Sequence, residues 1–411
     1  MKPLEGIKVV ELADYVSAPV CTRLLADMGA KVIKIERDGG NTWRGEGPKC
    51  RPERFCETEN PVFDIYNTGK ECIVLNLKTQ EGLNICKKLL ASADVFVTNN
   101  RVKALQRMGL DYDSLKSEFP KLIYAIGLGY GEKGPDADSP AFDHTAFWAR
   151  TGFLLDCGCA GANYTPVLPP GAMGDTFTGI TLVSEVLAAL FNREKTGKGD
   201  YVRSSLFHNG IFANGEMQII TQRPFGDTTY PKTRASFGLP VGHYRCKDGE
   251  YLYIAAGYAP ILVPKVFTMI GRPDLIESEK FNSDVARIEN RDELWDILQD
   301  AMLTKDVDDW VKLSREYDIP VTKMKHYADV SEDEQALANN YIQSVQYANG
   351  NIDMIVSSPI EMDSVGITMT EPSHLIGEDT YNVLKEYGYS DKIIEEYNAK
   401  GIVFCRNEED R

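Results

Sequence analysis

Residues 7–36 read IKVVELADYVSAPVCTRLLADMGAKVIKIE, and their pattern indicates the fold class. Its two ends, Ile7–Leu12 and Lys31–Glu36, are short apolar runs rich in β-branched residues, which are typical of buried parallel strands. Between them, Pro19 suits the first turn of a helix and Gly29 suits its end. The stretch therefore predicts a strand, a helix and a second strand in that order.

The same alternation continues along the chain. Residues 72–77 (CIVLNL), 94–98 (DVFVT) and 122–126 (LIYAI) have the composition of strands, and residues 80–92 have an amphipathic helical pattern. Strands that alternate with helices indicate an α/β fold with a Rossmann-like, doubly wound parallel sheet. The run 177–191 is apolar around most of its helical circumference, which predicts a buried helix.

We expect two domains. Residues 1–225 and 330–411 should together form a large domain that contains the sheet, and residues 226–329 should form a smaller α+β domain with its linkers. The smaller segment contains two short strand-like runs, at 244–245 and 251–255, followed by helical runs rich in Asp, Glu, Trp and Leu.

The charge of the chain is unevenly distributed. Its 411 residues include 45 Lys and Arg against 61 Asp and Glu, and the resulting net charge of −16 argues against a protein that binds nucleic acid or another polyanion with its whole surface. Residues 1–110, however, contain 17 Lys and Arg against 14 Asp and Glu, whereas the remainder contains 28 against 47. If the chain binds a phosphorylated ligand, the first quarter is therefore the electrostatically favoured place. Its cations either converge at the carboxyl ends of the strands or are ordinary charges of a solvated surface: Lys34, Arg37, Lys70, Lys78, Arg101, Lys103 and Arg107.

Missing patterns exclude several classes of protein. No apolar run reaches the roughly 18 residues of a membrane span, and no signal-peptide pattern is present, so a cytoplasmic location is expected. The nine cysteines and five histidines lack metal-ligand spacing, so no metal site is expected. The loop Ala13–Ala18 lacks the glycines of a dinucleotide-binding turn, which disfavours an NAD-dependent oxidoreductase. The chain also lacks a phosphate-binding P-loop and a G-x-S-x-G nucleophile elbow.

The segment Ala172–Gly179 (AMGDTFTG) places one carboxylate, Asp175, between a loop rich in Gly and Pro and an apolar helix. One interpretation makes Asp175 the N-cap of that helix. The other makes it a catalytic carboxylate, with the glycines on either side leaving room for a substrate to approach. The residues alone leave both interpretations open.

Several segments, in the right order and spread over almost the whole chain, resemble the class III CoA-transferase family. They are GIKVVEL, LLADMGAKVIKIE, NTGKECIVLNLKTQEG, ADVFVTNNRVKALQRMGLDYDSL, IGLGYGEKGP, FDHTAFWARTG, GAMGDTFTG and TGKGDYVRSSL. Within the family, FVTNNRVKALQRMG, GYGEKGP and YRCKDG are most similar to the (R)-phenyllactate and (R)-2-hydroxyisocaproate type of amino-acid-fermenting anaerobes. The resemblance implies transfer of CoA from an acyl-CoA or enoyl-CoA to a 2-hydroxy acid. It also implies an interlocked homodimer and no cofactor, because the CoA thioester is itself a substrate.

The resemblance further implies roles for particular residues. Asp175 is the expected nucleophile, which would form a mixed anhydride with the acyl group and then an aspartyl-CoA thioester. Backbone N–H groups near Gly174 or of the helix that follows it are candidates for stabilising the oxyanions. The positions matched to CoA contacts are Tyr15, Val16, Ser17, Arg37, Leu75, Lys78, Asn99, Arg107 and Met108.

The anhydride must be shielded from water. The expected walls of an apolar acyl pocket, which would otherwise be plain core, are Phe142, Phe147, Trp148, Phe153, Tyr164 and Phe177. The glycine-run lid of the family's formyl-CoA branch is replaced here by YPKTRASFGLP at 230–240.

Two alternatives to a CoA-transferase remain. The first is an epimerase like the 2-methylacyl-CoA racemases, but their His-Asp pair is here Phe142-Asp143. The second is a non-catalytic CoA-binding protein, against which the intact Gly174-Asp175 argues.

Overall fold

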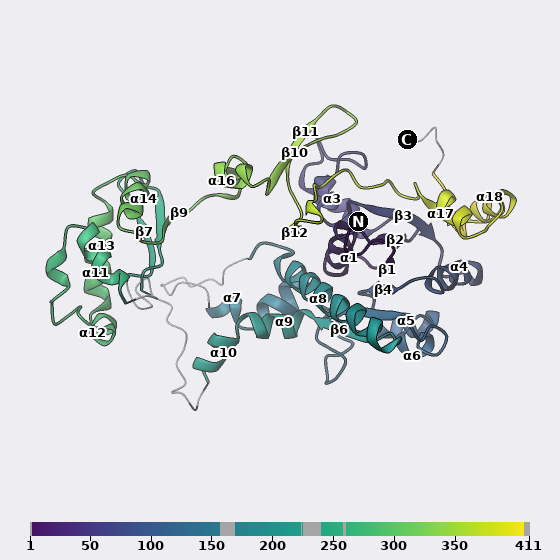
Figure 1. The fold of residues 1–411 in the computed structure, drawn as a ribbon, viewed down its shortest axis with the longest axis horizontal. Coiled ribbons are helices and arrows are strands. Elements are labelled where there is room, and N and C mark those ends of the chain that lie inside the picture. The colour runs from purple at the N-terminus through teal and green to yellow at the C-terminus, as the bar shows by residue number, and fades with distance from the viewer. Residues whose placement is uncertain (1, 157–168, 223, 225–239, 258–259, 407–411) are drawn as a thin grey trace. The chain divides into compact units, whose positions relative to one another are not determined.

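The computed structural model describes residues 2–156, 169–222, 224, 240–257 and 260–406, which form two units (Figure 1). The large unit consists of the described parts of Met1–Phe153, Pro169–Gly215 and Ser331–Arg411. The small unit consists of those of Leu154–Leu168 and Glu216–Val330. The large unit is therefore assembled from segments that precede and follow most of the small unit in the sequence.

A seven-stranded sheet forms the centre of the large unit. Its strands lie in the order β14-β3-β2-β1-β4-β5-β6, and all are parallel except β14. The predicted α/β fold with a mostly parallel, doubly wound sheet is confirmed, and the strand order reverses between β1 and β4. The strands are β1 (Lys8–Leu12), β2 (Lys31–Glu36), β3 (Lys70–Leu75), β4 (Val95–Thr98), β5 (Ile123–Leu128), β6 (Tyr201–Ser205) and β14 (Val403–Phe404).

Two apolar cores cover opposite faces of this sheet, because successive side chains of a strand point to opposite sides. Val9 of β1 lies in the core beneath α1 (Ser17–Asp27) and α8 (Met173–Thr196). The next residue, Val10, lies in the core on the other face. That face is covered by α4 (Gln80–Leu90), α5 (Val102–Met108), α6 (Tyr112–Leu115), α17 (Thr380–Glu386) and α18 (Asp391–Ala399).

Helix α8 crosses α1 at very short range. A Cβ at Gly179 would lie 2.5 Å from the carbonyl oxygen of Ser17, so only glycine allows this contact. The helix ends where Gly197 adopts a left-handed conformation with a φ of 67°. By length and composition α8 could also cross a membrane, yet it packs on α1 and the sheet as the core helix of a globular unit does.

The outer side of α8 is open in the single chain. Phe177, Ile180 and Phe191 are 38%, 43% and 66% exposed. The prediction of a buried helix over 177–191 is therefore right for the side of α8 that faces α1 and the sheet and wrong for the opposite side of the single chain.

A buried ion cluster joins three neighbouring strands. The Glu11 carboxylate of β1 accepts a hydrogen bond from Lys34 of β2 and lies 2.9 Å from the ammonium of Lys70 of β3, and all three side chains are fully buried. Although burial raises the pKa of Glu11, the two ammonium groups lower it to about 2. Burial lowers the pKa of Lys70 to about 8. The expectation that Lys34 and Lys70 serve a phosphorylated ligand is therefore wrong, because both cations neutralise Glu11 inside the core.

The C-terminal segment completes the sheet. Strand β14 pairs antiparallel with β3, and the Asp379 carboxylate accepts the backbone N–H of Cys72 at 2.7 Å. Two antiparallel pairs precede it: β10 (Ile342–Gln346) with β11 (Ile352–Val356), and β12 (Glu361–Met362) with β13 (Gly366–Ile367).

The remaining short helices lie along the chain outside this segment, except α16. They are η1 (Thr42–Gly45), α2 (Glu46–Cys50), α3 (Pro61–Asn67), η2 (Asp143–Ala149), α7 (Phe153–Asp156), α9 (Leu206–Ala213), α10 (Gly215–Ile220) and α16 (Glu334–Ala338).

The small unit combines an antiparallel sheet with helices around its own core. Strand β8 lies between β7 and β9, and the core includes Phe267 and Trp310. The Trp310 Nε1–H group donates to the Met302 carbonyl at 2.9 Å, so this buried indole is satisfied. The elements are β7 (Gly242–Arg245), β8 (Tyr251–Ile254), α11 (Leu262–Met269), η4 (Pro273–Leu275), α12 (Asp284–Glu289), α13 (Arg291–Met302), α14 (Val307–Glu316), β9 (Val321–Lys323) and α15 (Tyr327–Val330).

Candidate active site

The first turn of α8 carries Asp175. Ala172 holds the N-cap position with a φ of 67°, so the interpretation of Asp175 as the N-cap is wrong. Gly174 lies directly on η2: a Cβ there would be 2.3 Å from Phe147 Cγ and 2.4 Å from Asp143 Oδ1. Gly174 is therefore required by packing, and the expectation that it opens a path for substrate is wrong.

Asp143 holds the start of α8 in place. Its Oδ1 accepts the backbone N–H of Asp175 at 2.9 Å, its Oδ2 accepts Trp148 Nε1–H at 3.0 Å, and the N–H of Gly174 also donates to it. The Asp143 side chain is buried, and burial raises its pKa against these hydrogen bonds. Asp143 therefore engages the N–H groups of both Gly174 and Asp175. That backbone N–H groups near Gly174 or of the following helix stabilise an oxyanion stays a prediction.

The carboxyl group of Asp175 has a strongly raised pKa of about 7. Burial is the main cause, and the nearby negative charge of Asp143 adds to it, whereas a hydrogen bond from the Ser17 hydroxyl opposes the rise. At neutral pH, Asp175 therefore exists in comparable amounts as acid and carboxylate. A carboxylate that is poorly stabilised by its surroundings is a more reactive nucleophile than an exposed one.

A cavity of about 380 Å³ opens beside Asp175 at the point where the strand order reverses. In open α/β sheets, ligands bind beyond the carboxyl ends of the strands at this position. The cavity is lined by the segments that follow β1, β4 and β5, together with the starts of α8 and α9. Its lining residues include Asp14, Tyr15, Ser17, Asn99, Asn100, Arg101, Asp138, Ser139, Phe142 and Asp175.

Side chains, rather than glycines, set the shape of the loop after β1. Asn99 accepts the backbone N–H of Asp14 at 3.0 Å and donates to its carbonyl at 2.6 Å. The Asp14 carboxylate in turn accepts the backbone N–H of Tyr15 at 2.9 Å and that of Thr42 at 2.8 Å. Tyr15 adopts a φ of 60° and meets the Phe142 ring edge-on at 5.2 Å. This network fixes the loop that the sequence showed to lack a dinucleotide-binding turn.

The residues matched to CoA contacts fall into three groups. Tyr15, Ser17 and Asn99 line the cavity at Asp175. Arg107 lines an adjoining cavity of about 630 Å³ that shares Arg101 and Asp138 with the first. The others do not line either cavity: Arg37 and Lys78 are exposed elsewhere, Met108 is half-buried against the core, and the side chains of Val16 and Leu75 are buried in it.

The aromatic residues expected around the acyl group are divided in the same way. Phe142 lines the cavity and is 53% exposed, so it is placed to contact a ligand. Phe147 and Trp148 are buried and pack with Phe153, while Phe177 is 38% exposed on α8. Tyr164 lies outside the described residues, as does nearly all of the segment 230–240 in place of the glycine-run lid.

Several residues of this region were not identified as site residues from the sequence. Asp143 and Asp14 act through backbone N–H groups, a role that has no sequence signature. Tyr66 is half-buried behind the first turn of α8, where its hydroxyl bonds to Thr176, and loss of hydration raises its pKa. Tyr66 and Thr176 also line a mostly apolar cavity of about 280 Å³ between α1, α3 and α8.

Across residues 2–156, 169–222, 224, 240–257 and 260–406, no three His, Cys, Asp or Glu side chains form a cluster able to hold a metal ion.

Known proteins resemble this chain over nearly its whole length. Residues 4–380 match the family described as CoA-transferase family III. The chain is 37% identical to the (R)-2-hydroxy-4-methylpentanoate CoA-transferase of Clostridioides difficile, over 97% of this chain and 99% of the relative. It is also 37% identical to the cinnamoyl-CoA:phenyllactate CoA-transferase of Clostridium sporogenes, over 98% of each. A solved structure of a CAIB/BAIF family protein from Brucella suis is similar with a TM-score of 0.78 at 28% identity, over 94% of this chain and 99% of that one.

Proposed function

Since this chain belongs to CoA-transferase family III, we propose that it moves CoA from an acyl-CoA or enoyl-CoA to an (R)-2-hydroxy carboxylic acid with an aromatic or branched side chain. The observation that carries the proposal is the half-buried carboxylate of Asp175, whose pKa is strongly raised, beside a cavity at the topological switch point. The substrate class rests on the near full-length similarity to the two clostridial enzymes, whose names contain 2-hydroxy acids. Such an activity would supply a 2-hydroxyacyl-CoA for dehydration to an enoyl-CoA in amino-acid fermentation in the cytoplasm.

Asp175 is the nucleophile of a double-displacement reaction. Its carboxylate attacks the thioester carbonyl, which forms a mixed anhydride and expels CoA thiolate. The thiolate attacks the aspartyl carbonyl of the anhydride, which forms an aspartyl-CoA thioester and releases the first acid. The carboxylate of the incoming acid attacks this thioester, and the returning thiolate then takes the new acyl group and restores Asp175.

The surroundings of Asp175 favour the first step electrostatically. The ionised carboxylate is opposed by burial and by the charge of Asp143. Forming the anhydride removes the charge from Asp175, so this repulsion is relieved as the reaction proceeds. Asp143 contributes as a positioning residue, because it also anchors the N–H of Asp175. Because Asp143 accepts the N–H groups of Gly174 and Asp175, other backbone N–H groups of the first turns of α8 are the better candidates for oxyanion donors.

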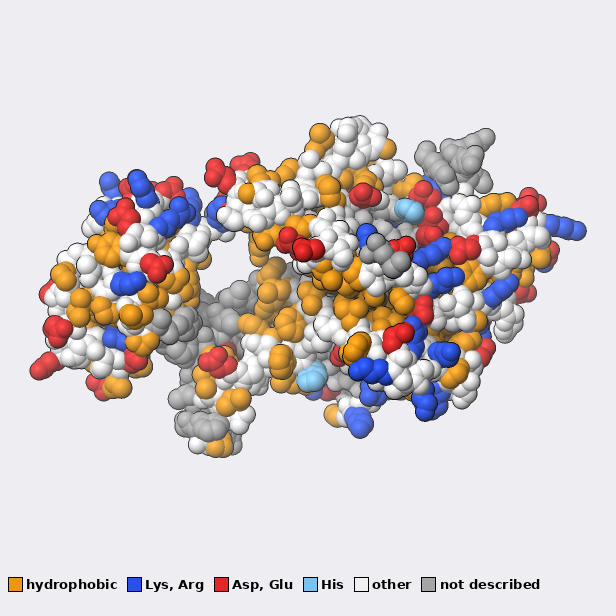
Figure 2. Space-filling model, in the orientation of Figure 1, with side chains coloured by type: hydrophobic (Ala, Val, Ile, Leu, Met, Phe, Trp, Pro, Cys, Tyr) orange, Lys and Arg blue, Asp and Glu red, His pale blue; other side chains and the backbone are white. Residues whose placement is uncertain are grey.

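Basic side chains line the cavity next to the one at Asp175, which suits the binding of the phosphates of CoA. Arg107 and Arg101 line the cavity that adjoins the one at Asp175, and Lys103 lies with them. On the face drawn in Figure 2, Lys and Arg side chains gather over α5 and α6. These cations are placed to bind the phosphates of CoA, whose acyl end would lie at Asp175.

The active form is a homodimer. The support for this is the apolar surface of α8 and α9, where Ile211 and Phe212 are 37% and 77% exposed next to the open side of α8. Figure 2 shows apolar side chains gathered over these two helices. An exposed apolar surface of this kind is uncommon on a monomer. Sedimentation of the wild type and Phe212→Lys tests the proposal: a wild type that sediments as a monomer contradicts it.

The function is tested with a panel of acids and one CoA donor. Wild-type protein should form the CoA thioesters of branched or aromatic 2-hydroxy acids, and Asp175→Asn should form none. Borohydride should trap an aspartyl-CoA thioester at Asp175 during turnover. Retained CoA exchange in Asp175→Asn refutes the mechanism. Exchange of the α-proton in deuterated water without CoA transfer would instead identify an epimerase.

A further inference from the structure

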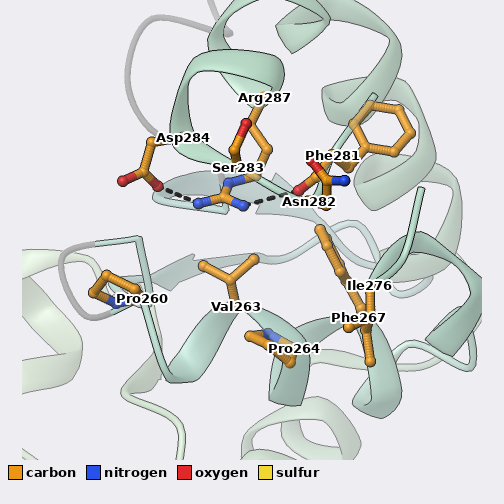
Figure 3. A pocket seen from close by; sticks show the side chains of 10 residues that line it. All are labelled: Pro260, Val263, Pro264, Phe267, Ile276, Phe281, Asn282, Ser283, Asp284 and Arg287. Atoms are coloured by element: carbon orange, nitrogen blue, oxygen red, sulfur yellow. Dashed lines mark hydrogen bonds and ion pairs between the residues drawn. The ribbon is translucent and has the colours of Figure 1, made fainter. Parts of the chain in front are cut away.

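A further pocket lies in the small unit, between α11 and the segment that leads into α12. Its volume is about 310 Å³, at the lower end of the roughly 300–1,000 Å³ usual for ligand sites. The lining is mainly apolar: Pro260, Val263, Pro264, Phe267, Ile276 and Phe281. The remaining lining residues are Asn282, Ser283, Asp284 and Arg287 (Figure 3). The pocket therefore combines an apolar lining with a single cation.

Arg287 is the unusual member of this lining. Arg287 is only 6% exposed, and a buried cation is costly unless it is paired and fully hydrogen-bonded. One terminal nitrogen donates to the Phe281 carbonyl at 2.8 Å, and the other bonds to the Asp284 carboxylate. Nε has no acceptor among the described residues. A guanidinium carries five N–H donors, so much of its bonding capacity is unused.

Asp284 compensates this cation only in part. Its side chain is 66% exposed, so water screens much of its charge, and it bonds to one nitrogen only. In Figure 3 the two bonded nitrogens of Arg287 form the edge of the guanidinium that faces Val263 across the pocket. An anion in the pocket would meet that edge.

We infer that this pocket binds a small carboxylic acid with an apolar body. Its carboxylate would bond to Arg287, alongside or in place of Asp284, and its body would contact Val263, Phe267 and Ile276. A single, partly paired cation suits a monoanion, because the nearby Asp284 would repel a phosphate dianion. The inference does not depend on the reaction proposed at Asp175.

The test uses 4-methylpentanoate as the probe and resolves the site by NMR. In the full-length protein, ¹³C-methyl signals of Val263 and Ile276 report on the pocket, while those of Val186, in the core of the large unit, serve as a reference. We expect saturable shifts of the Val263 and Ile276 signals in the millimolar range, little effect from the neutral 4-methylpentanamide, and little effect from acetate, which lacks the apolar body.

Three variants examine the role of the cation. Arg287→Gln should weaken binding of the acid roughly tenfold or more, because a charge-assisted hydrogen bond is lost. Asp284→Asn should strengthen it severalfold, because the competing charge is removed. Arg272→Gln, which removes an exposed arginine paired with Asp274 outside the pocket, should leave binding unchanged.

Some results would overturn the inference. They are an absence of saturable shifts, equal binding of the acid and the amide, or weaker binding in Asp284→Asn. Should Arg287→Gln fail to fold, the comparison of acid with amide and the Asp284→Asn variant still decide the question.

Discussion

Replacing Asp143 with Asn should make Asp175 easier to ionise. Asp143 bears a negative charge beside Asp175, and this charge is the second cause, after burial, of the raised pKa of Asp175. Asparagine has almost the same shape and no charge. The variant therefore separates the electrostatic effect of Asp143 from the packing of η2 against α8.

The magnitude follows from the pKa of Asp175. A pKa of about 7 against an ordinary 3.8 corresponds to about 4 kcal/mol in favour of the protonated form. Since burial contributes most of this, the pKa in Asp143→Asn should fall below 7 without reaching 3.8. Only about a tenth of wild-type Asp175 is ionised at pH 6, so the ratio of activity at pH 6 to that at pH 8 should rise severalfold in the variant.

The absolute rate should fall at the same time. The amide oxygen that Asp143→Asn introduces can accept from the N–H of Asp175 or from Trp148, but the new amide N–H group then faces the other donor. A donor left without an acceptor costs about 1–3 kcal/mol, which would lower the rate by about fivefold to a hundredfold.

The assay is the pH dependence of kcat/KM for CoA transfer, which reports the ionisation of the free enzyme. The wild-type acid limb should have its midpoint near pH 7, and that of Asp143→Asn should lie lower. Asp138→Asn is the matched control, because Asp138 lines the same cavity but pairs with Lys103. An unchanged midpoint in Asp143→Asn, or an equal shift in Asp138→Asn, would show that the charge of Asp143 does not raise the pKa of Asp175.

Further predictions concern the same site. Asp175→Asn should abolish transfer yet stabilise the protein at pH 8. Burial raises the pKa of Asp175 to about 7, so keeping this group in the fold costs wild-type stability as the pH rises from about 4 to 7. The variant's gain in free energy of unfolding, up to about 4 kcal/mol, should vanish near pH 4 in thermal unfolding. Gly174→Ala should place its Cβ within 2.4 Å of Asp143 Oδ1, which should cost about 1–3 kcal/mol and lower kcat; wild-type activity and Tm would contradict this. Asn99→Ala should release the loop after β1 and raise the KM for the CoA thioester about tenfold, because two hydrogen bonds to Asp14 are lost; an unchanged KM removes Asn99 from the site. Arg107→Ala should raise the same KM while leaving kcat unchanged, since Arg107 lies in the adjoining cavity, and a lowered kcat with unchanged KM would contradict that placement.

Much of the fold could be predicted from short-range patterns. The strands Lys31–Glu36 and Val95–Thr98 lie within a residue of the predicted runs, because a buried parallel strand needs a continuous apolar segment. Helix α8 shows the limit of this reasoning. Its composition indicated burial on most sides, but composition does not say which sides other parts of the chain cover, and its outer side is open.

The site was predicted less completely. Tyr15, Ser17, Asn99 and Asp175 meet in one cavity, whereas Lys34 and Lys70, equally attractive as cations, are buried against Glu11. A lysine that binds a ligand and a lysine that is buried against a carboxylate look alike in a sequence. The side to which a strand residue points, and the charge that it meets there, depend on the neighbouring strands.

Consecutive residues are enough to specify the alternation of strands and helices and the membership of CoA-transferase family III, because both depend on apolar periodicity and on ordered motifs. The chemistry of Asp175 depends instead on the folded chain. Its raised pKa depends on burial and on Asp143, which is 32 positions away in the chain but bonds to the N–H of Asp175 at 2.9 Å. Charge interactions depend on distance through space and on the exclusion of water, and neither quantity exists until the chain has folded.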